Sequence, residues 1–241
     1  MRIAVLSDVH ANLRAFEAVL AEIDTCGFDG IWCLGDIVGY GPKPNECAAL
    51  LQQRATICLA GNHDLVVLGK IPIDAFAGEA AAAARWTQTV LDERARAFLD
   101  ALAPQAEASG AELFHGSPRD PVWDYVLSDE SAASALALTE APLVLVGHSH
   151  VALEISDGGD LRGEPAPAGT DLALGGLRRL LNPGSVGQPR DGDPRAAWLE
   201  IDFAAARATF RRTDYPVERT QAEMREVGLP EALALRLAYG I

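Results

Sequence analysis

The chain has 241 residues, of which 49% are hydrophobic, and its formal net charge is −14. This length and composition suit one large domain or two small ones with a buried core, and no run of about eighteen apolar residues is present to span a membrane. The negative charge opposes non-specific binding to nucleic acid or to anionic membranes, because such binding requires a basic face.

The amino-terminal stretch and the cysteines indicate the cellular compartment. The apolar run within residues 1–8 is too short for a signal peptide, so we expect a cytoplasmic protein. The four cysteines, Cys26, Cys33, Cys47 and Cys58, form no Cys-x-x-Cys pair. We therefore predict reduced core cysteines, and a thiolate metal site is disfavoured.

The first sixty residues alternate between predicted strands and helices. Apolar runs predict buried strands at 3–6, 31–34 and 55–60. Asn12 can cap a helix whose apolar residues repeat at intervals of three and four up to Gly27, and a second helix is predicted from Asn45 to about Gln53. This β-α-β-α-β order with short links implies parallel strands and right-handed crossovers.

The remainder of the chain mixes helices with hairpin strands. Two helices are predicted within 74–102, a strand at 111–114, a helix from the cap Ser128 to Leu138, and a buried strand at 143–146. Hairpin strands follow at 151–155, 177–181, 196–203 and 207–212, with a surface loop at 165–170. A helical tail begins at about residue 216, with Pro230 as a first helical residue. Because no repeat or linker interrupts the chain, we predict a single domain over residues 1–241, a mixed β sandwich flanked by helices.

Five of the apolar runs end in polar groups that are able to bind metal. One such group alone is readily explained as a hydrogen-bonded structural residue, and Gly61–Asp64 alone as a strand-to-loop turn. However, the carboxyl ends of strands in α/β sheets meet at one rim, and all five histidines of the chain fall at these ends. The groups are Asp8 with His10, Asp36, Asn62 with His63, His115, and His148 with His150. Their co-occurrence favours a metal site.

The chemistry of these side chains narrows the choice of metal. Imidazole nitrogens with carboxylate and amide oxygens, and no sulfur, suit Mn, Fe, Ni, Zn or Co better than Ca. Seven candidate ligands are too many for one ion but suit two ions that share a bridging carboxylate: Asp8, His10, Asp36, Asn62, His115, His148 and His150. Two divalent ions against two carboxylates leave a local positive excess with which an acidic protein can hold phosphate. Two metals about 3.5–4 Å apart can also clamp an in-line displacement and activate water.

In order and over most of the chain, these motifs resemble the calcineurin-like metallophosphoesterase superfamily. The stretches at 34–42 and 182–187 are similar to its small, stand-alone prokaryotic branch. The resemblance implies an α/β fold, a four-layer α/β/β/α sandwich of two mixed sheets. It also implies hydrolysis of phosphate monoesters or diesters by metal hydroxide, with two divalent transition-metal ions as cofactors, manganese being the first expectation.

The resemblance further assigns roles to the site residues. One metal would be held by Asp8, His10, Asp36 and His150, and the other by Asp36, Asn62, His115 and His148. His63 would contact the phosphate, together with Asn62, and protonate the leaving oxygen. Asp64 could orient His63 or cap a turn. Asn12 is expected to cap a helix, and a contact with the substrate is the alternative role. Asn182–Ser185 is interpreted as a turn that buttresses the His148–His150 loop.

One departure from the family pattern bears on the substrate. The serine/threonine phosphatase branch continues its Gly-Asp motif with an aspartate that orients the catalytic histidine and an arginine that grips phosphate. This chain has Gly39 and Tyr40 there, which argues against a dedicated phosphoprotein phosphatase. Arg119 or Arg190 could bind the phosphate instead, although for each a plain surface arginine is the favoured interpretation.

Three functions are thus compatible with the sequence. The first is a phosphoesterase acting on a small phosphorylated substrate, and the second is a phosphoprotein or dinucleoside polyphosphate phosphatase. The third is a non-catalytic metal-binding scaffold, which is disfavoured because none of the seven candidate ligands is lost. Whether the protein is a monomer or a homodimer stays open.

Overall fold

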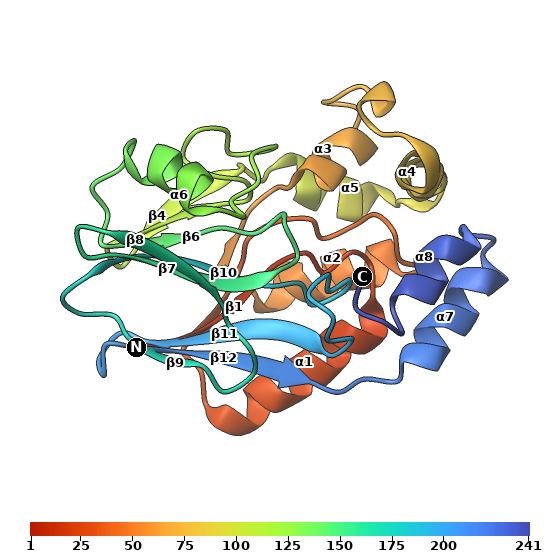
Figure 1. Cartoon of the computed structure of the whole chain (residues 1–241). Coiled ribbons are helices and arrows are strands. Elements are labelled where there is room, and N and C mark those ends of the chain that lie inside the picture. Colours follow the sequence, from red (N-terminus) through yellow and green to blue (C-terminus); the bar gives the residue numbers. More distant parts are fainter.

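Two six-stranded sheets form the centre of the computed structural model, which describes residues 1–241 (Figure 1). The first sheet has the order β3-β2-β1-β11-β12-β9 and the second β4-β5-β6-β10-β7-β8. Each sheet contains both parallel and antiparallel pairs, so both sheets are mixed. Helices cover the outer faces of both sheets (Figure 1). The predicted four-layer sandwich is confirmed.

The elements have the following bounds. The strands of the first sheet are β1 (Arg2–Leu6), β2 (Gly30–Cys33), β3 (Ile57–Cys58), β9 (Asp171–Ala173), β11 (Ala196–Asp202) and β12 (Arg207–Thr213). Those of the second are β4 (Gln105–Ala108), β5 (Ala111–Phe114), β6 (Leu143–Leu145), β7 (Ala152–Asp157), β8 (Leu161–Pro165) and β10 (Arg178–Pro183). The helices are α1 (Leu13–Cys26), α2 (Pro44–Arg54), α3 (Asn62–Val67), the 3₁₀ turn η1 (Ile73–Ala75), α4 (Gly78–Val90), α5 (Glu93–Asp100), α6 (Asp129–Leu136), α7 (Val217–Glu226) and α8 (Glu231–Arg236).

Strand β1 shows why the central strands are apolar throughout. Ala4 and Leu6 pack into the core under α1, whereas Ile3 and Val5 point into the core between the two sheets. Successive side chains of a strand face opposite ways, so a strand with cores on both sides needs apolar residues at every position. The same alternation occurs in β6, where Leu145 faces the other sheet and Val144 faces α6.

Helix α1 forms where its periodicity and caps predicted it. The Asn12 side chain accepts a hydrogen bond from the backbone N–H of Ala15 at 3.2 Å, which satisfies one of the free donors of the first turn. Gly27, with a φ of 68°, ends the helix in the left-handed conformation. Phe16 and the other predicted apolar residues on the same face are buried against the first sheet.

Several predicted elements differ from the structure. The strand predicted at 55–60 pairs only over β3, because the backbone leaves the sheet after it and the Ala60 N–H bonds to the carbonyl of Ala103 at 2.9 Å. The stretch that follows is the helix α3 and not a loop. Pro230 precedes α8 as its cap and is not its first residue. Strands β4, β8 and β9 were not predicted, because most of their side chains are exposed or half-buried and they carry no apolar pattern.

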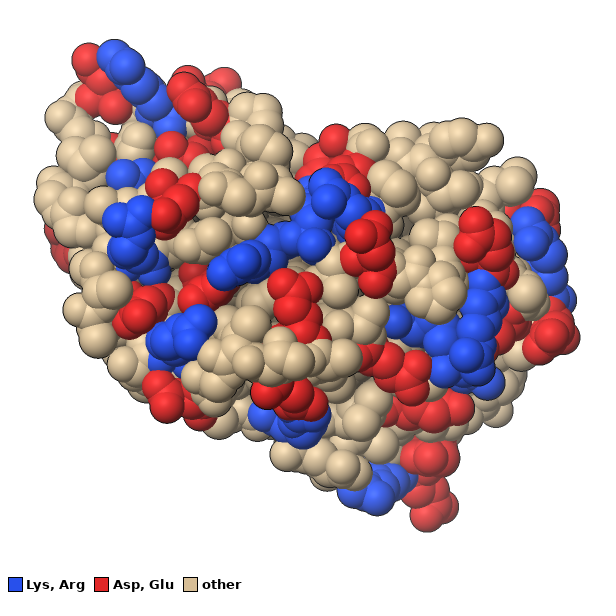
Figure 2. All heavy atoms as spheres, turned by 90° about the horizontal axis from the view of Figure 1, so that it is seen from below, with Lys and Arg blue, Asp and Glu red and all other residues tan.

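The surface carries both signs of charge. On the face shown in Figure 2, basic and acidic side chains lie interleaved and form no large basic patch. Many are paired: Glu200 on β11, for example, lies 2.6 Å from both Arg2 and Arg211 on the neighbouring strands. None of the helices combines the length and the hydrophobicity that crossing a membrane would require.

Candidate metal centre

The predicted ligands meet at one rim where both sheets end. Strands β1, β2 and β3 of the first sheet lead to Asp8, His10, Asp36 and Asn62, and strands β5 and β6 of the second lead to His115, His148 and His150. None of these seven residues is more than 3% exposed. The fold therefore brings together side chains that lie up to 142 positions apart in a buried polar cluster, counting from Asp8 to His150.

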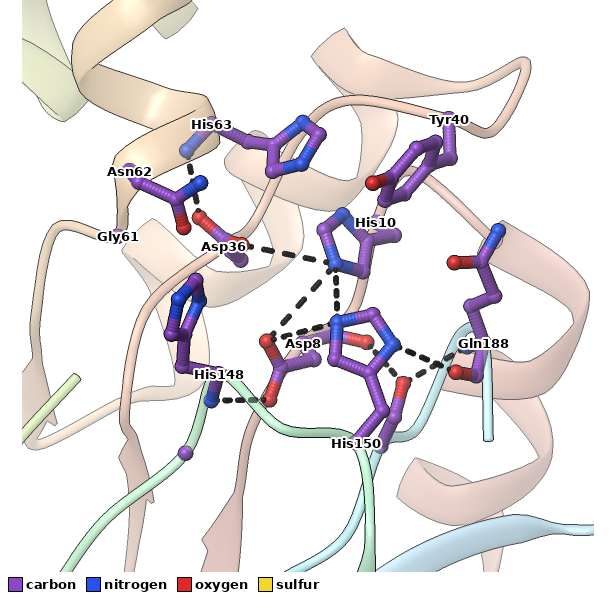
Figure 3. A network of polar contacts seen from close by, with 12 residues as sticks. Asp8, His10, Asp36, Tyr40, Gly61, Asn62, His63, His148, His150 and Gln188 are labelled. Carbon is purple, nitrogen blue, oxygen red and sulfur yellow. Dashed lines mark hydrogen bonds and ion pairs between the residues drawn. The ribbon is translucent and has the colours of Figure 1, made fainter. Parts of the chain in front are cut away.

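Within this cluster, ligand atoms form two overlapping groups that share Asp36. Asp8, His10, Asp36 and His150 form one group (Figure 3). Asp36, His115 and His148 form the other, and the ligand atoms of each group lie within 4.8 Å of one another. Asp36 Oδ2 lies 3.6 Å from His10 Nε2 and 3.5 Å from His115 Nε2. The amide oxygen of Asn62 lies 3.0 Å from His115 Nε2 and adds a neutral donor to the second group.

Each carboxylate has one anchored oxygen and one free oxygen. Asp8 Oδ2 accepts a hydrogen bond from the backbone N–H of His148 at 3.1 Å, and Asp36 Oδ1 accepts one from the backbone N–H of His63 at 2.8 Å (Figure 3). Asp8 Oδ1, Asp36 Oδ2 and His148 Nε2 are buried without a hydrogen-bond partner. Buried polar atoms are rarely left unsatisfied, so these inward-pointing atoms fit bound cations.

Backbone carbonyls fix the histidine rings. His10 Nδ1 lies 3.1 Å from the carbonyl of Val38, and His150 Nδ1 lies 2.6 Å from that of Gln188. His115 Nδ1 lies 2.9 Å from the carbonyl of Leu34 in the same way. A carbonyl can only accept, so each Nδ1 carries the proton and each Nε2 presents its lone pair to the cluster.

The electrostatics of the cluster also fit cations. Burial lowers the pKa of every histidine in it, that of His148 to about 3, so the rings are neutral and able to coordinate metal. Burial, reinforced by Asp64 and Asp8, raises the pKa of Asp36 well above its usual range. A cation beside Asp36 would remove this penalty, because it stabilises the ionised carboxylate.

The loops that carry the ligands hold strained backbone. Asp8, His10, Asp36, His148 and His150 have φ values of 54°, 47°, 51°, 63° and 61°, all in the left-handed region. That region costs a non-glycine residue roughly 1–2 kcal/mol, with Asp and His somewhat more tolerant than most. Strain of this kind persists at functional sites when the surrounding contacts hold it.

Asp64 holds the loop before α3. Its carboxylate accepts hydrogen bonds from the backbone N–H groups of Ile37 at 3.0 Å, Val38 at 3.0 Å and Gly61 at 2.9 Å. It makes no hydrogen bond to the imidazole of His63. The structure thus supports the capping role of Asp64. No hydrogen bond supports the alternative role, in which Asp64 orients His63.

The imidazole of His63 lies beside the metal-ligand cluster and belongs to neither group. Its centroid lies 4.9 Å from that of His10 and 4.4 Å from that of Tyr40 (Figure 3), and its Nδ1 has no hydrogen-bond partner. A Cβ atom at Gly39, whose φ is 90°, would lie 2.5 Å from His63 Nδ1. The glycine in place of the phosphatase aspartate therefore makes room for this ring.

The three predicted substrate contacts outside the cluster differ in their placement. Asn12 has no free polar atom: Oδ1 accepts from Ala15 and Thr220, and Nδ2 donates to the carbonyl of Gly187 at 2.9 Å. It acts as a cap, and its predicted substrate contact is not supported. The Arg119 side chain is 53% exposed and pairs with Asp124, so its predicted phosphate grip is not supported either.

Arg190 instead faces the cluster. Its guanidinium lies 5.7 Å from the Tyr40 ring centroid, and its Nη2 lies 2.9 Å from Gln188 Oε1. The pKa of His63 is lowered mainly by burial, then by His150 and then by the charge of Arg190. The pKa of His150 is lowered mainly by burial and then by the charge of Arg190. Arg190 Nε is buried without a partner. Of the two arginines considered as phosphate grips, Arg190 is the one that the fold places at the site.

The buttress predicted for the His148–His150 loop is confirmed. Asn182 Nδ2 donates to the carbonyl of Gly147 at 2.7 Å and to Ser149 Oγ at 3.0 Å. Asn182 belongs to β10, however, which continues through Pro183 where we predicted a turn.

Four aromatic residues near the cluster were missed. Tyr40, Phe76, Trp123 and Tyr125 come from segments with no strand-end pattern, so only tertiary structure reveals them.

Comparisons with known proteins agree with this geometry. The family model of the calcineurin-like phosphoesterase superfamily domain matches residues 1–203. A metallophosphoesterase from Sphaerobacter thermophilus is 42% identical in sequence and superimposes with a TM-score of 0.91, covering 100% of this chain and 99% of its own. An uncharacterized protein from Methanocaldococcus jannaschii is 37% identical over 99% of this chain and 98% of its own. A hypothetical protein from Pyrococcus horikoshii is 20% identical with a TM-score of 0.81, covering 100% of this chain and 98% of its own, and shares the fold.

Proposed function

The chain belongs to the calcineurin-like phosphoesterase superfamily, and from this premise we propose that it is a dinuclear metal-dependent phosphoesterase acting on small phosphate esters. The observation that carries the proposal is the pair of ligand groups that share Asp36, with free oxygens on Asp8 and Asp36 directed into them. Asp36 would bridge two ions, Asp8, His10 and His150 would complete one site, and Asn62, His115 and His148 the other. Two divalent ions, manganese as the first expectation, would supply a nucleophile from water at neutral pH and neutralise phosphate oxygens.

The protein itself would supply the proton and the orientation of the substrate. His63 lies beside the metal-ligand cluster with Nδ1 buried toward Gly39, so the opposite ring nitrogen, Nε2, would deliver the proton to the leaving oxygen of a phosphate held there. Burial lowers the pKa of His63 well below its usual range, and the electrostatic influence of His150 and the charge of Arg190 lower it further. His63 can therefore act as an acid only when the negative charge of the bound phosphate raises its pKa again.

A metal and substrate screen tests this function. Chelator-treated protein would be assayed with nitrophenyl phosphate and bis(nitrophenyl) phosphate after adding Mn, Fe, Co, Ni or Zn, with Ca as the control ion. We expect hydrolysis that depends on a transition metal, two bound ions per chain, and a preference of about tenfold or more for the monoester or the diester. Bound metal without hydrolysis would instead favour the non-catalytic metal-binding scaffold, and absence of both would contradict the proposed function.

Arg190 is proposed to bind a phosphate oxygen. Replacing it with methionine keeps much of the side-chain volume but removes the charge, and the backbone bond from Arg190 N to the His150 carbonyl is unaffected. A hydrogen bond to a charged group contributes about 1.5–3 kcal/mol, so we expect KM to rise roughly ten- to a hundredfold. Steady-state kinetics of the metal-loaded protein would measure this change, and Arg190→Lys should recover part of it.

Arg119→Met is the matched control for this experiment. Arg119 is exposed and pairs with Asp124, so its removal should change KM less than twofold. A larger effect of Arg119→Met than of Arg190→Met would transfer the phosphate grip to Arg119 and contradict our placement.

A further inference from the structure

Aromatic side chains surround the metal centre, and the proposed function gives them no role. We call Tyr40, Phe76, Trp123 and Tyr125 the aromatic collar. They come from three separate segments: the loop between β2 and α2, the connection between η1 and α4, and the connection between β5 and α6. Rings from distant parts of the chain thus converge on one site.

The collar forms a continuous chain of ring contacts from the predicted acid to the second ligand group. Aromatic rings attract one another at centroid distances of about 4.5–7 Å. Two of the five spacings lie in that range, and the other three are shorter. The centroid distances are 4.4 Å for Tyr40 and His63, 4.3 Å for His63 and Phe76, 6.0 Å for Phe76 and Trp123, 6.4 Å for Trp123 and His148, and 4.0 Å for His148 and Tyr125.

Tyr125 combines a ring contact with the cluster and a substantial solvent exposure. One face of its ring stacks on His148 with an interplanar angle of 20°, yet the residue is 46% exposed. Ligand sites commonly combine aromatic side chains with a few polar groups, and Tyr125 brings such a ring to the edge of the polar cluster. Because His148 belongs to the metal-ligand cluster, a group stacked on the other face of Tyr125 would be separated from this cluster by the Tyr125 ring.

The loop that carries Trp123 and Tyr125 is rigidly held. Asp124 Oδ2 accepts a hydrogen bond from Ser117 Oγ at 2.5 Å, and the backbone N–H of Asp124 donates to the carbonyl of Asp120 at 3.4 Å. Asp120 Oδ1 accepts from the backbone N–H of Trp123 at 3.1 Å. This bracing fixes both rings before any ligand binds, as a stacking platform requires.

We propose that the aromatic collar is a binding subsite for a planar aromatic group of the substrate, and that the preferred substrates are nucleotide esters rather than aliphatic phosphates. The proposal rests on the proposed phosphoesterase function and extends it to a substrate class. A net charge of −14 leaves the protein little electrostatic attraction for a nucleotide beyond the metal centre. Stacking does not depend on charge, and aromatic side chains supply it to any nucleobase.

Two substrates that differ only in the base provide the kinetic test. Adenosine 5′-monophosphate and ribose 5-phosphate share the same leaving oxygen, and their methyl esters serve if the protein prefers diesters. We expect kcat/KM to be at least about tenfold higher for the adenosine compound, and Tyr125→Leu to remove most of that difference. Tyr125→Phe keeps the ring and should retain it, and Tyr239→Ala is the control because Tyr239 is an exposed tyrosine outside the collar. Equal loss for both substrates in Tyr125→Leu, or no preference in the wild type, would overturn the proposal.

A binding measurement tests the subsite without turnover. Adenosine added to the protein should change the fluorescence emission of Trp123. Subtracting the signal of Trp123→Phe from that of the wild type separates this change from the emission of the other tryptophans. Tyr125→Leu should weaken this binding by about tenfold, whereas ribose should cause no change. If the protein binds adenosine in this way but hydrolyses no ester, the phosphoesterase function fails and the subsite stands. If it hydrolyses esters but adenosine binding does not depend on Tyr125, the subsite fails alone.

Discussion

His63→Asn is expected to lower kcat by about a hundred- to ten-thousandfold while the protein keeps both bound metals. The imidazole belongs to neither ligand group, and only the backbone N–H of His63 contacts Asp36. Asparagine preserves that N–H, so the metal-ligand cluster should remain intact. Metal content by elemental analysis and kcat at saturating substrate would be measured on the same preparation.

The dependence on the leaving group separates an acid from a residue that only positions phosphate. Proton donation matters most when the leaving oxygen is strongly basic, so His63→Asn should impair an alkyl ester far more than a nitrophenyl ester. An equal loss for both esters would show that His63 binds phosphate and donates no proton. Unchanged turnover for the alkyl ester would contradict the catalytic role altogether.

The neighbourhood of His63 illustrates what the sequence could and could not predict. The strand ends predicted the position of His63 and of the ligands, because the carboxyl ends of strands place side chains at a common rim whatever the surrounding loops do. The room that the His63 ring occupies depends on the absence of a side chain at Gly39, and the ring is enclosed by Tyr40 and Phe76 from other segments. Such contacts arise from tertiary packing and leave no periodicity in the sequence.

The roles of Asp64, Asn12 and Arg190 were ambiguous for the same reason. Asp64 and Asn12 are residues whose short side chains serve equally as ligands, substrate contacts and caps, and only the hydrogen bonds they make decide between these roles. Arg190 follows β10 in a loop whose path depends on the bond from its N–H to the His150 carbonyl. The layers of the fold were easier to predict, because strands buried on both faces are apolar along their whole length, whereas the exposed strands β4, β8 and β9 carry no such pattern.

Asp36→Asn is expected to abolish the stabilisation that metals give to the protein without destabilising the metal-free form. Asp36 is the carboxylate common to both ligand groups, so its loss should prevent the binding of two ions. In the metal-free protein it is a buried carboxylate whose Oδ2 has no partner and whose pKa is raised by burial and by Asp64 and Asp8. An amide removes that buried charge, and its oxygen can still accept from the His63 N–H.

The expected size of the effect follows from linkage. Metal at a hundred times its Kd stabilises the folded protein by about 2.7 kcal/mol, which corresponds to a rise in Tm of roughly 5–10 °C for a chain of this length. Wild type should show this rise on addition of Mn, and Asp36→Asn should show none, with a metal-free Tm equal to or above that of metal-free wild type. Differential scanning calorimetry of both proteins, with chelator and with Mn, would measure it.

Asp64→Asn is the control that distinguishes a ligand from a structural carboxylate. Asp64 accepts three backbone hydrogen bonds, and an amide has only one oxygen with which to accept them. Its substitution should lower the Tm of the metal-free and the metal-loaded protein alike and leave the rise on Mn addition in place. A metal-dependent rise that survives in Asp36→Asn but is lost in Asp64→Asn would reverse the roles of the two carboxylates, because only the residue that contacts the ions can couple their binding to folding.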